Sequence, residues 1–278
     1  ELVENGHTGE KAGKGFYDYS DGGPYHYISH ELTEEGKLHV LFDREERLNA
    51  FSTDMFNEVQ RLLETVDDED VACVVFEGAG DRAFSAGADI TGFTVAEPTD
   101  LASVDETVQT IYEYPRPTVA KIDGFCLGAG LEITLACDLR YATEGSRLGS
   151  PEIDLGLIPG GGGTQRLVRL VGEPRTKELV YRGMQLSADQ AEDWGILNRA
   201  VEADEFEETI DDVVDDLVNG PQTALEVAKQ VIQEGQDASL DTGLSLEAQG
   251  FGLLATTDDM LEGVAAFNQD REPDFGGD

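Results

Sequence analysis

The chain has 278 residues, of which 40% are apolar, and its 58 acidic and 19 basic residues give a net charge of −39. That charge excludes a nucleic-acid-binding surface, and no apolar run approaches the roughly 18 residues that span a bilayer. Because the acids alternate with periodic apolar residues, we expect a folded cytoplasmic protein, kept soluble in the concentrated salt of a halophilic organism by its acidic surface.

The first 24 residues do not have the pattern of a domain start. Residues 9–19 (GEKAGKGFYDY) hold two of the six lysines, and residues 20–24 are a predicted turn or linker. The segment resembles the C-terminal signature of 3-hydroxyacyl-CoA dehydrogenases. This implies that residues 1–24 are the tail of a dehydrogenase domain fused to a second enzyme. The chain has neither an initiator methionine nor a signal peptide, so we expect a processed chain or a piece of a longer one.

From Tyr25 onward, short strands and helices are predicted. Residues 25–30, 38–42, 118–122 and 139–142 are predicted strands. Residues 71–76 are a continuous apolar run, which is typical of a strand buried on both faces. Ser52 is predicted to cap a helix whose apolar residues recur at helical spacing from Met55 to Leu63.

Gly-rich segments lie between these elements and are the candidates for function. Residues 83–90 (AFSAGADI) precede a predicted helix, and residues 124–138 (GFCLGAGLEITLACD) pass from a small-residue turn into an apolar helix. Exposed N–H groups beside a helix N-terminus favour an oxygen that carries negative charge. The recurrence of strand, Gly-rich turn and helix predicts an α/β fold, a β-β-α spiral. Helices are expected after it near residues 205–218, 221–234, 239–255 and 258–268.

Several familiar sites are absent from the sequence. Residues 160–163 are four glycines, but Thr164, Gln165 and Arg166 follow where a nucleotide-phosphate loop needs Lys and then Ser or Thr. All four histidines lie within the first 39 residues, far from the Gly-rich segments, so we do not expect histidine-based catalysis. The three cysteines (Cys73, Cys126 and Cys137) lie in apolar runs without metal-ligand spacing, which favours buried thiols.

Two carboxylates stand apart from the charged clusters. Glu132 interrupts the apolar part of residues 124–138, and Glu152 lies in a Gly-rich setting. Either one alone is as well explained by a helix cap or by pairing with an arginine. Together they suit a site that activates one water molecule and moves one proton. An apolar surround would raise the pKa of such a carboxyl, so that it acts as an acid near neutrality.

Residues 83–90, 123–138 and 149–167 together resemble the signature segments of the enoyl-CoA hydratase/isomerase (crotonase) superfamily, in the same order and at the same separations. Residues 262–267 with 271–273 resemble the last helix of that family. The resemblance covers residues 25–278. It implies a crotonase-like spiral core over residues 25–204 and a C-terminal helical region, residues 205–278, that assembles trimers or hexamers.

The resemblance also implies roles for individual residues. The backbone N–H groups of Ala88 and Ala129 would form an oxyanion hole for a thioester carbonyl. Glu132 would orient and deprotonate a water molecule, and Glu152 would deliver a proton to C2. The residues expected to contact the CoA thioester or the bound water are Arg47, Ala86, Gly87, Asp89, Ile90, Gly128 and Gly160.

The implied reaction is a hydro-lyase reaction of fatty-acid β-oxidation or related acyl-CoA metabolism, in which water adds to trans-2-enoyl-CoA to give 3-hydroxyacyl-CoA. It requires no metal and no cofactor, since coenzyme A enters with the substrate. The alternatives are a Δ3-Δ2-enoyl-CoA isomerase or another crotonase-type enzyme, and a non-catalytic acyl-CoA-binding subunit. Thr91 and Asp270 stand where the family often has basic residues, so Arg47, Arg82 or Arg271 is expected to hold the CoA phosphates.

Overall fold

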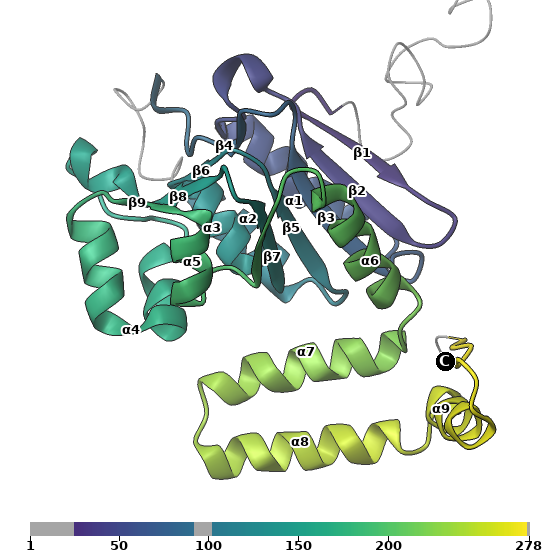
Figure 1. Ribbon diagram of the computed structural model, residues 1–278. Helices are drawn as coiled ribbons and strands as arrows, with labels where there is room; N and C mark the ends of the chain where they lie inside the picture. Colours follow the sequence, from purple (N-terminus) through teal and green to yellow (C-terminus); the bar gives the residue numbers. More distant parts are fainter. Residues whose placement is uncertain (1–24, 92–101, 277–278) are drawn as a thin grey trace, which may run out of the picture.

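The structure is a computed structural model and describes residues 25–91 and 102–276 (Figure 1). The core contains two sheets. The larger has the strands β1 (Ile28–Leu32), β2 (Lys37–Phe42), β3 (Cys73–Gly78), β5 (Thr118–Ile122), β7 (Leu139–Thr143) and β10 (Arg199–Val201), in that order. The smaller has β4 (Ala83–Ser85), β6 (Phe125–Leu127), β8 (Arg147–Gly149) and β9 (Gln185–Ser187). The pairs β1–β2 and β8–β9 are antiparallel, and the other pairs are parallel.

Three successive turns of the chain each contribute one strand to each sheet and then a helix. β3 and β4 precede α2 (Ala102–Glu113), and β5 and β6 precede α3 (Ala129–Ala136). β7 and β8 precede the 3-10 helix η5 (Pro151–Leu155) and then α4 (Gly163–Tyr181). This arrangement confirms the predicted α/β class and β-β-α spiral. The prediction missed the strands of the smaller sheet, because three residues are too few to show a period.

The helix α1 (Thr53–Thr65) begins where the sequence predicts it. Ser52 Oγ accepts a hydrogen bond of 3.3 Å from the Met55 N–H, and the apolar side chains of α1 are buried in the main core. The first strand is shifted relative to the prediction, since β1 spans Ile28–Leu32 and not residues 25–30. The three cysteines are buried free thiols as expected, and burial raises the pKa of each to about 12.

Two helices complete the core, and three more form an arm beside it. α5 (Ala188–Trp194) packs near β9 and β10, and α6 (Phe206–Val218) covers one face of the larger sheet. Figure 1 shows α7 (Gln222–Gln236) and α8 (Leu240–Leu254) as an antiparallel pair beneath the sheets, followed by α9 (Asp258–Gln269). The boundaries of α6 to α9 lie within two residues of those of the four predicted helices. The arm exposes many apolar side chains: Ile232, Leu240, Leu244, Phe251, Leu253, Leu261, Val264 and Phe267.

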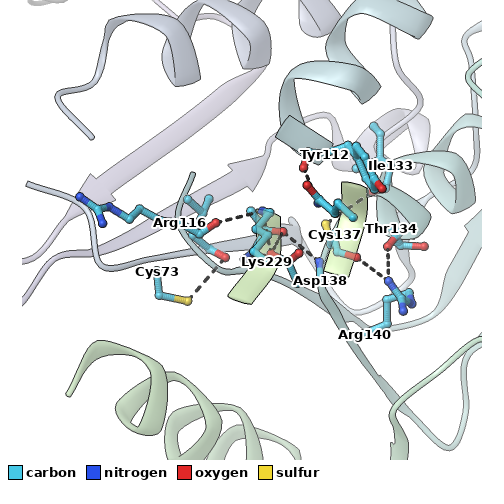
Figure 2. Close-up of polar contacts among 12 residues, drawn as sticks. Cys73, Tyr112, Arg116, Ile133, Thr134, Cys137, Asp138, Arg140 and Lys229 are labelled. Carbon is cyan, nitrogen blue, oxygen red and sulfur yellow. Dashed lines mark hydrogen bonds and ion pairs between the residues drawn. The ribbon is translucent and has the colours of Figure 1, made fainter. Parts of the chain in front are cut away.

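Lys229 fastens α7 to the C-terminal end of α3, as Figure 2 shows. Its Nζ lies 2.8 Å from Asp138 Oδ2 and donates to the Arg116 carbonyl at 3.2 Å. At the same end of α3, Arg140 donates to the carbonyls of Thr134 and Cys137. Carbonyls at a helix C-terminus lack partners within the helix, so the Arg140 guanidinium stabilises the end of α3.

The predicted domain boundaries fall at residues 24/25 and 204/205. The dehydrogenase-like segment lies in residues 1–24, outside the described residues, and the division at residues 25–204 and 205–278 stays a prediction. Within the described ranges, no helix is long and apolar enough to cross a bilayer.

Candidate active site

The candidate functional segments follow three neighbouring strands of the smaller sheet. Residues 86–90 follow β4, α3 begins two residues after β6, and η5 begins two residues after β8. Because β4, β6 and β8 are adjacent and parallel, their carboxyl ends lie at one edge of the sheet. A cavity of about 460 Å³ lies between the three segments. The topology therefore brings together residues that are more than 60 positions apart in the sequence.

All of the predicted site residues line this cavity: Arg47, Ala86, Gly87, Ala88, Asp89, Ile90, Gly128, Ala129, Glu132, Glu152 and Gly160. Six further lining residues were not predicted: Ala50, Val104, Pro151, Leu155, Leu157 and Ile158. They are apolar residues of the types that also form the core, so the sequence alone did not indicate that they line a site. Ile90, Leu155, Leu157 and Ile158 are each at least 45% exposed, which makes the cavity wall a surface for an apolar ligand group.

The backbone of residues 87–89 is fixed against Phe51. The Phe51 N–H donates to the Gly87 carbonyl at 2.8 Å, and the Asp89 N–H donates to the Phe51 carbonyl at 2.7 Å. The N–H of Ala88, between them, therefore points away from Phe51. Ala129 is the first residue of α3, where backbone N–H groups have no partner within the helix. Both residues line the cavity, so their N–H groups are candidates for binding one oxygen that carries negative charge.

Asp89 lines the cavity, but its carboxylate faces other protein groups. Asp89 Oδ1 accepts from the hydroxyl and the N–H of Thr91, and Oδ2 lies 2.9 Å from Arg44 Nη2. The Thr91 hydroxyl, with help from Arg44, lowers the Asp89 pKa to about 2. Arg44 also donates to the Ala50 carbonyl and lies over the Tyr27 ring. The Asp89 carboxylate therefore holds residues 86–90 in place, and the contact of Asp89 with CoA stays a prediction.

Glu132 is buried, 2% exposed, and its carboxylate has backbone donors. Its Oε1 accepts from the N–H of Gly161 at 2.7 Å and from the N–H of Gly163 at 2.9 Å. A Cβ on Gly163 would lie 2.9 Å from that same oxygen, so only glycine permits this approach. Burial raises the Glu132 pKa to about 7, and the two N–H groups oppose that rise by favouring the ionised form.

Glu152 lies on η5 in a different environment. Both of its carboxylate oxygens are buried, and neither has a hydrogen-bond partner among the described residues. Burial raises the pKa of Glu152 as well. The N–H groups of the glycine loop favour the charged form of Glu132, and Glu152 has no such donor from another residue, so the two carboxyls differ in what stabilises their ionised forms. One carboxyl can take a proton while the other gives one.

Of the three arginines expected to hold the CoA phosphates, the structure places one at the cavity. Arg47 is exposed and lines the cavity, whereas Arg82 and Arg271 are not among the lining residues. Arg271 instead pairs with Glu262 of α9. Of the described histidines, none lines the cavity, and His39 lies 2.7 Å from Glu77.

Comparison with known proteins adds to this geometry. A family model described as enoyl-CoA hydratase/isomerase matches residues 33–278. A short-chain-enoyl-CoA hydratase of Clostridium acetobutylicum is 33% identical over 252 residues, which are 87% of this chain and 95% of the relative. A crotonyl-CoA hydratase of Syntrophomonas wolfei is 34% identical over 250 residues, 88% of this chain and 96% of the relative. The crystal structure of an enoyl-CoA hydratase from Bacillus anthracis matches with a TM-score of 0.87 and 34% identity, covering 91% of this chain and all (100%) of that one.

Proposed function

The chain belongs to the enoyl-CoA hydratase/isomerase family, and from that premise we propose that it hydrates trans-2-enoyl-CoA to 3-hydroxyacyl-CoA. One observation carries this proposal. Glu132 and Glu152 line a single cavity beside the Ala88 and Ala129 N–H groups, and Glu132 has hydrogen-bond donors that Glu152 lacks. The names of the relatives as hydratases support it.

The oxyanion hole would activate the substrate. A thioester carbonyl that accepts from the Ala88 and Ala129 N–H groups becomes more polarised, and C3 of the conjugated double bond becomes electrophilic. As the water oxygen attacks C3, negative charge develops on the thioester oxygen. Fixed N–H groups stabilise that charge more than they stabilise the neutral substrate, so they lower the barrier.

The two carboxyls would move the protons. Glu132 takes a proton from water while the water oxygen bonds to C3, and Glu152 gives its proton to C2. The carbon–carbon π bond and one O–H bond of water break, and the C3–O and C2–H bonds form. The proton left on Glu132 must then pass to Glu152, directly or through solvent, before the next turnover. These steps use only groups of the chain and the substrate, and we propose that no metal or further cofactor takes part.

The cavity also suggests how the rest of the substrate is held. Ile90, Leu155, Leu157 and Ile158 offer apolar contacts to the pantetheine or acyl part. Arg47 is the basic residue of the lining set, and we propose that it contacts the CoA phosphates.

Incubation of crotonyl-CoA with the protein in H₂¹⁸O and concentrated KCl tests the proposal. A hydratase gives a product heavier than the substrate by one ¹⁸O-water, which mass spectrometry detects. An isomerase leaves the mass unchanged, as does a subunit that only binds acyl-CoA. A product without the added mass, equal to that of a heat-denatured sample, would refute the hydratase assignment.

We also propose an oligomeric state, a cellular environment and a fused domain. The exposed apolar side chains of α7 to α9 support assembly into a trimer or hexamer, which light scattering of the purified protein would measure. The net charge of −39 supports a cytoplasmic protein of a halophilic organism. The mass of the native gene product would test fusion to a 3-hydroxyacyl-CoA dehydrogenase.

A further inference from the structure

The carboxylate of Glu132 depends on a loop that has no side chains of its own. Residues 160–163 are all glycine, and the N–H groups of two of them donate to Glu132 Oε1. Glycine gives the backbone its close approach to Glu132, but it also gives the loop more conformational freedom than any other residue would. Contacts from outside the loop must therefore hold these N–H groups in place.

Arg166 supplies such a contact from the first turns of α4. Its Nη1 donates to the Gly161 carbonyl at 2.9 Å, on the same residue whose N–H reaches Glu132. Gly162 has a φ of +88°, and a Cβ there would lie only 2.2 Å from Arg166 Nη1. The loop conformation and the place of the guanidinium therefore depend on each other.

The guanidinium is itself held from the other side by α2. It lies over the ring of Tyr112, with 5.1 Å between Cζ and the ring centroid, and Nη2 donates to Gln109 Oε1 at 3.3 Å. Its planar fork thus bridges two elements, a geometry that the single ammonium of a lysine cannot reproduce. A bridge from α2 to the loop would limit the movement of the Gly161 N–H.

We propose that Arg166 is a positioning residue for Glu132. Its guanidinium fixes residues 160–163 against α2, so that the N–H groups of Gly161 and Gly163 stay directed at Glu132 Oε1. The proposal deepens the proposed function and rests on it, since it takes Glu132 to be the base of the hydration. Arg166 is not among the residues that line the cavity, so it acts through the loop and not by contact with substrate.

The charges around Arg166 and Glu132 determine in which direction the loss of Arg166 changes the Glu132 pKa. Glu132 interacts with Glu152 from η5, and Arg166 interacts with Glu132, with Tyr112 and Asp105 of α2 and with Arg169 of α4. Loss of Arg166 removes a cation near Glu132 and loosens its two backbone donors. Both changes disfavour the ionised carboxylate, so both raise the Glu132 pKa.

The substitution Arg166→Met tests the proposal by the pH dependence of hydration. We expect kcat at pH 7 to fall about 10- to 100-fold, as for a base displaced by a fraction of an ångström to an ångström, with little change in KM. The loss should be smaller at pH 9, because a base with a raised pKa is ionised there. Arg166→Lys, which keeps the charge, should recover part of the activity at pH 7. Arg169→Met is the matched control: Arg169 lies one turn further along α4, pairs with Asp237 and does not contact the loop.

A purely structural role would lower kcat equally at every pH, and that result, or an unchanged kcat, would overturn the proposal. If Arg166→Met does not fold, Arg166→Lys is judged by the same pH profile. A second readout does not need activity. In NMR spectra the amide signals of Gly161 and Gly163 should follow the titration of Glu132, with a midpoint at higher pH in the variant than in the wild type. An unchanged midpoint contradicts the positioning role, whereas a wild-type protein that fails to hydrate crotonyl-CoA contradicts the proposed function instead.

Discussion

Glu132 and Glu152 line one cavity from successive turns of the spiral, yet only Glu132 accepts backbone hydrogen bonds there. The sequence makes the two residues look alike, since each is a lone acid in an apolar or Gly-rich setting. The structure separates them by their donors. The proposed reaction makes use of this difference, with Glu132 as the ionised base and Glu152 as the protonated acid.

The first prediction concerns pH. Burial raises the Glu132 pKa to about 7, and the base must be ionised, so kcat/KM should fall as the pH decreases through this value. At high pH Glu152 also loses its proton, and kcat/KM should fall again. Steady-state rates with crotonyl-CoA from pH 5 to pH 10 at constant KCl would show the bell-shaped profile. Equal values at pH 5 and pH 7 would contradict an ionised carboxylate as the base.

The second prediction concerns the oxyanion hole. Ala129 is the first residue of α3, a position where proline fits a helix, and proline there puts a ring carbon in place of the N–H hydrogen. Ala129→Pro should therefore lower kcat about 10²- to 10³-fold, while the circular dichroism spectrum stays that of the wild type. Ala129→Gly keeps the N–H and is the control, with activity close to that of the wild type. Full activity of the proline variant would exclude this N–H from the reaction.

The third prediction concerns salt. A net charge of −39 destabilises the compact state through self-repulsion, which ions screen. The unfolding temperature should rise with KCl, most steeply at low salt, because the Debye length shortens from about 30 Å at 0.01 M to about 3 Å at 1 M. Thermal scans across this range are the measurement. A constant unfolding temperature, or one that rises only in proportion to the salt added, would speak against screening.

Local patterns in the sequence were sufficient for much of the fold. The helical spacing from Met55 to Leu63 with Ser52 before it predicts α1, and the apolar run of residues 71–76 indicates the buried strand β3. Such features are visible because each element repeats its own period. The strands β4, β6 and β8 have no period to detect, and only their pairing with one another brings the segments of the candidate site together.

The resemblance supplied the cavity residues, and their catalytic roles stay predictions. Sequence reasoning did not find the supports behind them, such as Arg44 beside Asp89 or Arg166 beside Gln109. These partners lie 45 and 57 positions apart, so no local pattern connects them. An arginine next to a glycine run looks like any surface arginine until the fold shows which carbonyl it contacts.

The most direct measurement of the central claim is the rate of crotonyl-CoA hydration by the wild type, Glu132→Gln and Glu152→Gln in concentrated KCl. Each glutamine keeps the shape of the side chain but can neither take nor give the proton, so each variant should lose about 10²- to 10⁴-fold in kcat. Thermal unfolding at pH 8 would check that both variants fold. Of the two variants, Glu132→Gln should have the higher unfolding temperature, because it removes a buried charge. If either variant keeps the rate of the wild type, the two carboxyls do not share the reaction, and the account is wrong.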